Sequence, residues 1–189
     1  MHPAQHRALR ELHAFARQLA RHWASLGERL GGPEGELLRA GAADARALVD
    51  ELSVATASRD VPGAPAAAVA GRLVSPRFPA PDRLLERNQA LRLAVLDVQH
   101  CVTLLGYVAR LAAADGEDAL RELCARWEGR LGEHERAARD AAVALGDRPD
   151  DAVAPADPGI AGRAGARVGW AVGAVGEWVD RQAAQRRSS

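Results

Sequence analysis

Apolar residues recur at alternating steps of three and four along several stretches of the chain, which is the period of a helix with one buried face. The first repeat consists of Leu9, Leu12, Ala16, Leu19, Trp23, Leu26 and Leu30. The second consists of Leu38, Gly41, Ala45, Leu48, Leu52 and Ala55. A later one consists of Leu120, Cys124, Trp127, Leu131, His134, Ala138, Ala141 and Leu145. These repeats predict helices over about 4–30, 34–58 and 118–145.

A further helix, predicted over 82–114, is apolar on two sides. Its first face consists of Leu84, Asn88, Leu91, Val95, Val98, Val102, Leu105, Ala109 and Ala112. Its second face consists of Leu93, Leu96, Leu104, Tyr107 and Leu111. A helix that is apolar on two sides is typically buried on two sides. We therefore expect something beyond the other three helices to cover it.

The connections between these helices differ greatly in length. Gly31-Gly32-Pro33 and Asp115-Gly116 are short turns, so each flanking pair of helices is expected to form an antiparallel hairpin. Residues 59–81 contain five prolines and form a long connection. Asp82 follows Pro81 and is a suitable N-cap for the next helix.

Two hairpins joined by a long crossover, with one more helix at the C-terminus, resemble the plan of the ferritin-like helical-bundle superfamily. The resemblance is one of architecture. From composition and pattern we predict an all-α fold with a four-helix bundle over 1–146, including the crossover 59–81, then a polar linker over 147–157 and a short fifth helix over 158–187. A simple up-down-up-down bundle with a long loop is the alternative topology.

Composition and charge restrict the function. The chain has 42 alanines and 22 leucines but no lysine, a bias typical of a GC-rich bacterial genome. Its 25 acidic and 25 basic residues balance, so no overall field attracts nucleic acid. The polar start and the absence of a membrane-length apolar run predict a cytoplasmic protein. Cys101 and Cys124 lie in leucine-rich stretches and are expected to be buried free thiols.

The ferritin-like resemblance implies a metal site built from Glu-x-x-His motifs. This chain has one related motif, Asp97-Val98-Gln99-His100, while Leu131 stands where His134 would need an acid. Asp97, His100 and His134 are therefore the candidate ligands of a transition-metal ion. The competing interpretation, which we favour, is a core histidine satisfied by one carboxylate or carbonyl, with no cofactor.

The C-terminal segment carries a stripe of glycines within an arc of about 80° on a helix. The stripe consists of Gly162, Gly165, Gly169, Gly173 and Gly176. Glycine lowers helix propensity, so close packing against another backbone is expected, within the protomer or across a dimer. Trp170 and Trp178, with several arginines, give a second interpretation as a helix on a membrane surface.

These patterns favour a non-catalytic cytoplasmic helical bundle that acts in assembly or partner binding. We expect a homo-oligomer, or a protein partner bound through the C-terminal helix and the two-faced helix. One alternative is a divergent ferritin-like protein that binds a metal or small ligand in the bundle centre. The other is a peripheral membrane protein that uses its C-terminal helix.

Overall fold

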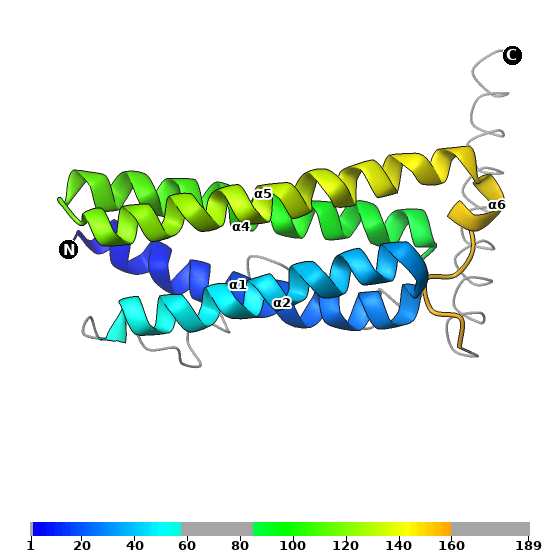
Figure 1. Cartoon of the computed structure of the whole chain (residues 1–189), viewed down its shortest axis with the longest axis horizontal. Helices are drawn as coiled ribbons and strands as arrows, with labels where there is room; N and C mark the ends of the chain where they lie inside the picture. The colour runs from blue at the N-terminus through cyan, green and yellow to red at the C-terminus, as the bar shows by residue number, and fades with distance from the viewer. Residues whose placement is uncertain (1, 58–84, 160–189) are drawn as a thin grey trace, which may run out of the picture.

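The computed structural model describes residues 2–57 and 85–159, and the long elements within these ranges are all helices. They are α1 (Pro3–Leu30), α2 (Gly32–Ala55), α4 (Arg87–Ala114) and α5 (Asp118–Ala144). A turn of 3-10 helix, η3 (Leu145–Asp147), and the short α6 (Pro149–Ala152) follow (Figure 1). The described part of the chain has no strand beyond one isolated bridge, so the prediction of an all-α protein is confirmed.

The helix boundaries follow local sequence signals. α1, α2 and α5 begin and end within three residues of the expected positions. α4 instead begins at Arg87, with Glu86 as its N-cap in a capping box with Gln89, so the expected start at Asp82 is wrong. The cause is tertiary, because the Leu85 carbonyl accepts a hydrogen bond from the chain that follows α6. Glu86 forms an isolated bridge with Pro155 and is extended rather than helical.

Two of the expected segments lie outside the described residues. These are the crossover 59–81 and, apart from its first two residues, the C-terminal helix 158–187. All five glycines of the stripe over 162–176 are among the residues left out. The membrane-surface interpretation of that helix falls outside the described residues for the same reason.

The four long helices pack side by side as two hairpins. α1 contacts α2 and α4, and α5 contacts α4 and α2 (Figure 1). At one end of the molecule the Arg87 guanidinium donates to the Leu30 carbonyl, 3.1 Å away, so the start of α4 lies beside the end of α1. Arg87 also lies 3.5 Å from Glu34, at the start of α2. α2 and α4 therefore begin at the same end and run in the same direction.

The buried faces meet in one apolar core, which contains most positions of the predicted repeats. Trp23 of α1 is fully buried in this core. Its ring lies against Gly41 of α2, where an added Cβ would be 2.3 Å from Trp23 Cζ3. The absence of a side chain at Gly41 thus allows the indole to fill the space between the two helices.

The segment after α5 packs against the helix ends, although the sequence predicts a polar linker over 147–157. Leu145 and Ala156 are 1% and 0% exposed. The backbone N–H of Ala156 donates to the Leu85 carbonyl over 2.9 Å, and that of Arg87 to the Ala154 carbonyl over 2.8 Å. These buried contacts explain why a segment with few apolar residues is held in place.

Replacing Gly41 by alanine tests the packing of Trp23. The new Cβ has no room beside the ring, so the indole or the helix must shift. We expect the free energy of unfolding to fall by about 1–3 kcal/mol, the usual cost of overpacking a core, as measured by urea denaturation.

Gly129→Ala is the matched control, because an added Cβ at this exposed position of α5 meets no atom within 4 Å. It should raise the stability by up to about 1 kcal/mol through helix propensity. A Gly41→Ala protein as stable as the wild type would show that the Trp23 contact does not set the spacing of α1 and α2.

Candidate functional site

Asp97 and His100 lie on the side of α4 that faces α1. His22 Nδ1 lies 2.8 Å from an Asp97 carboxylate oxygen, and both side chains are mostly buried. His100 Nε2 is 3.6 Å from a Glu11 carboxylate oxygen, and its ring is packed 4.1 Å, centre to centre, from that of Phe15. Each of the two candidate ligands is thus paired with a different residue of α1.

His134 lies in a separate place, between α5 and α2. Its Nε2 is 2.8 Å from Asp44 Oδ2. Arg130, one turn earlier on α5, donates to both oxygens of the same carboxylate, over 2.8 and 2.6 Å. The His134 ring also meets Trp23 edge-on, with 6.4 Å between ring centres. His134 is therefore satisfied by one carboxylate, and the acid is Asp44 of α2.

The structure does not bring Asp97, His100 and His134 together. Among the described residues no group of three or more His, Cys, Asp or Glu side chains is placed to hold a metal ion. The expectation of a shared metal site from these three residues is wrong. The physical reason is the helix order, because α4 presents its polar side chains to α1 while α5 presents His134 to α2.

Glu34 forms a second polar centre at the end of the molecule where α2 and α4 begin. It is only 8% exposed and lies in the first turn of α2. Arg148 donates to it over 2.9 Å, and Arg87 lies 3.5 Å away. One carboxylate thus connects α2, the start of α4 and the segment after α5.

Seven ion pairs that join different elements of the fold share one property. Each connects the first hairpin, α1 and α2, with α4, α5 or the segment after α5. Within the first hairpin the contact is instead close and largely apolar, as at Gly27 and Gly35, whose backbones touch. Charge therefore contributes to the docking of the hairpins on each other.

Burial and these partners shift several pKa values. Burial raises the pKa of the Asp44 carboxyl, but hydrogen bonds from Arg130 and His134 outweigh it and leave the pKa below its ordinary value. The pKa of Glu34 is lowered in the same way, because Arg148 and Arg87 outweigh its burial. The pKa of His13 is lowered by burial and by the nearby charge of Arg17.

The two cysteines are buried free thiols, as the sequence predicts. Burial raises the pKa of Cys101 to about 12, and that of Cys124 likewise to about 12, with a contribution from Glu128. Thiolate is the nucleophile and the metal ligand, so neither residue is suited to either role.

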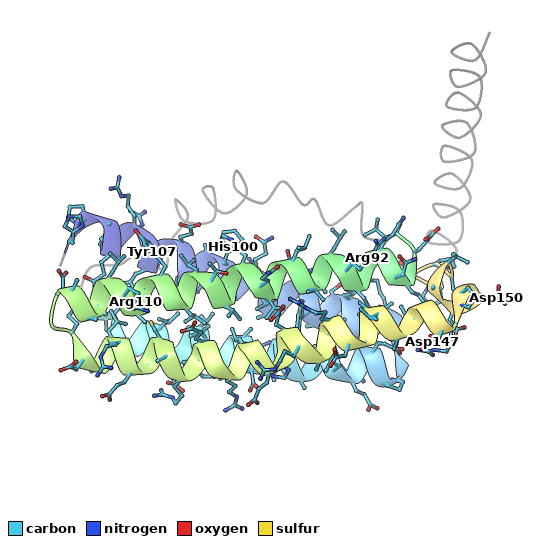
Figure 2. All side chains as sticks on the ribbon, turned by 90° about the horizontal axis from the view of Figure 1, so that it is seen from above. Arg92, His100, Tyr107, Arg110, Asp147 and Asp150 are labelled. Atoms are coloured by element: carbon cyan, nitrogen blue, oxygen red, sulfur yellow. The ribbon has the colours of Figure 1, made fainter. Side chains whose placement is uncertain are left out.

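The second apolar face of α4 is open in part, where the sequence predicts burial on both sides. Leu104 is buried and Leu93 and Leu111 are partly covered. Leu96 and Tyr107 are 53% and 50% exposed, which corrects the expectation that they are covered. Figure 2 labels Tyr107 on α4, together with Arg92 and Arg110 of the same helix. This outward face of α4 is the candidate functional site.

The sequence patterns did not reveal the arginine partners of the two acids that join α2 to α5. Asp44 and Glu51 stand beside the apolar repeat of α2 in the sequence, and periodicity alone assigns them no partners. The structure gives them Arg130 and Arg126 of α5. The available signal was the position of two acids at the edge of a buried face, where interhelical ion pairs commonly form.

Comparisons with known proteins add no identification. The chain matches no model of a protein family, no curated protein and no solved structure.

The interaction of Asp44 with Arg130 and His134 should contribute more to stability than an exposed ion pair on the same two helices. Asp44→Ala removes one carboxylate that binds two side chains and lies mostly buried. We expect it to lower the free energy of unfolding by about 1–3 kcal/mol, measured by urea denaturation. Glu51→Ala, which removes the more exposed pair with Arg126, should cost at most about 1 kcal/mol. If both variants lost the same free energy of unfolding, the buried Asp44 carboxylate would contribute no more to stability than the exposed Glu51.

The lowered pKa values predict a loss of stability in acid in two stages. The folded state favours neutral His13, so its contribution is complete above the ordinary pKa of 6.5 and declines as the pH falls below that value. Glu34 and Asp44 favour their charged forms, so their contributions are complete above the ordinary values of 4.5 and 3.8. They are lost as the pH falls through the lowered folded values.

Denaturant unfolding from pH 8 to pH 3 separates the two stages. The wild type should lose stability relative to His13→Gln as the pH falls from about 6.5. Its advantage over Glu34→Gln should instead be constant down to about pH 5 and shrink below that value. A difference between wild type and either variant that does not change with pH would contradict the assignment for that residue.

Proposed function

We propose that this protein is a non-catalytic helical protein that binds a protein partner through the outward face of α4. One observation carries the proposal, namely the exposure of Leu96 and Tyr107 on a helix whose opposite face forms the core. The two residues are eleven positions apart, which is three helical turns, and so they lie on one line along the helix. Partly covered Leu93 and Val102 adjoin this line.

The chemistry of this face suits a protein surface. An exposed tyrosine offers a large apolar ring with a polar end, and tyrosine is enriched in interfaces. α4 is also the one described helix that is long and apolar enough to cross a membrane by length and composition. Core helices of globular proteins pass the same test, and much of the apolar surface of α4 is directed at the other helices.

We further propose the ferritin-like plan for the bundle. The parallel course of α2 and α4 supports it, because the chain must then travel from one end of the molecule to the other between these helices. The up-down alternative requires α2 and α4 to be antiparallel.

A non-catalytic role is supported by the way the interior polar side chains pair with one another. His22 pairs with Asp97 between α1 and α4, and His134 pairs with Asp44 between α5 and α2. The four side chains are therefore used in two separate helix contacts rather than gathered round one point. The two buried thiols support a cytoplasmic location, where such groups stay reduced. Self-association through the glycine stripe remains a separate proposal.

Substitution of the two exposed residues tests the proposed function. Leu96→Gln with Tyr107→Gln should leave the free energy of unfolding within about 0.5 kcal/mol, because surface changes outside special features cost little. A photo-activatable cross-linker at Thr103, between the two residues, should yield a discrete protein adduct in cells of the source organism. The adduct should be lost in the double variant.

Val54 and Val143 provide the matched control, since they are 80% and 73% exposed on other helices. Val54→Gln with Val143→Gln should preserve the adduct formed from Thr103. An adduct that survives loss of Leu96 and Tyr107, or that consists of lipid, would refute partner binding by α4.

A further inference from the structure

The outward face of α4 has a charge pattern as well as an apolar one. Between its two ends the exposed positions are Arg92, Leu96, Gln99, Thr103, Tyr107 and Arg110. The charged residues in this row are the two arginines, one at each end (Figure 2). They are eighteen residues apart, which is about 27 Å along a helix.

Carboxylates flank the middle of the row on both sides. On the α1 side Glu11 lies beside His100 of α4, 3.6 Å from its Nε2. On the α5 side the Glu128 carboxylate lies next to Gly106, where an added Cβ would be 2.9 Å from Oε1. Along the helix the face therefore presents positive charge, then an uncharged centre with two apolar and two polar side chains, flanked by negative charge, then positive charge.

This pattern is unfavourable for pairing with a second copy. In an antiparallel pair with full overlap, Arg92 faces Arg110 of the other copy, and the acid-flanked centres face each other. In a parallel pair each arginine faces its own counterpart. Like charges placed opposite each other across an interface act against association. A shift by half the row avoids the repulsion but leaves only about half of the contact.

We infer that the partner is an amphipathic helix of a different protein, with an acidic residue near each end of its apolar face. These two acids are spaced about 27 Å apart to meet Arg92 and Arg110, and the centre of the helix is apolar and free of acids. The inference rests on the proposed function, since it specifies the partner of the same face. Helix binding through a row of apolar anchors is a common mode of recognition.

The test uses the full chain and two synthetic helical peptides of about 22 residues. Both have the same leucine-rich apolar face. One has glutamates eighteen positions apart at its ends, and the other has arginines there. By fluorescence anisotropy at low salt, the wild type should bind the glutamate peptide about tenfold more tightly, with the difference shrinking as salt rises. Arg92→Glu with Arg110→Glu should reverse the preference.

The remaining outcomes separate failure of the inference about the partner from failure of the proposed function. Equal binding of both peptides, no binding of either, or no reversal in the charge variant overturns the inference about the partner. Peptide binding unaffected by Leu96→Gln with Tyr107→Gln places the contact elsewhere and refutes the proposed function. A wild-type dimer in sedimentation that dissociates in that double variant supports the proposed function but identifies a second copy as the partner, which overturns the inference.

Discussion

The packing of the rest of the molecule depends on the buried indole of Trp23. Its ring occupies the space between α1 and α2 that Gly41 leaves open, and it meets the edge of His134 from α5. A ring that is fully buried among three helices sets their mutual distances, because close-packed interiors tolerate little change in volume. The position of His134, and with it the hydrogen bond to Asp44, follows from this contact.

Around that core, the ion pairs of Asp97, Glu51 and Asp44 connect the two hairpins, and that of Glu34 connects the first hairpin with the segment after α5. An apolar contact is indifferent to pH, whereas the pairs made by Asp44 and Glu34 depend on the ionisation of their carboxyls. Packing and charge thus stabilise different contacts of the fold. Helix hairpins are held by close packing, while their docking also uses charge. Leu96 and Tyr107, on the outward face of α4, are instead about half exposed.

Much of the fold was accessible from local sequence. Periodicity identified the four long helices, because a helix with one buried face requires apolar residues at steps of three and four. Short glycine-containing turns identified the two hairpins. The start of α4 was misplaced because Asp82 is a good N-cap locally, yet the backbone of Leu85 pairs with a segment some seventy residues later. Propensity describes the chain near a residue and carries no information about such pairing.

The sequence by itself determined that the chain is helical, which residues form most of its core and that its two thiols are buried. Only the tertiary structure decided which acid meets His134, since Asp97 and Asp44 are both suitable carboxylates and the order of the helices selects Asp44. It also decided that Leu96 and Tyr107 are exposed. Periodicity shows that a helix face is apolar, but whether a neighbour covers that face depends on how many helices the chain supplies and where they pack.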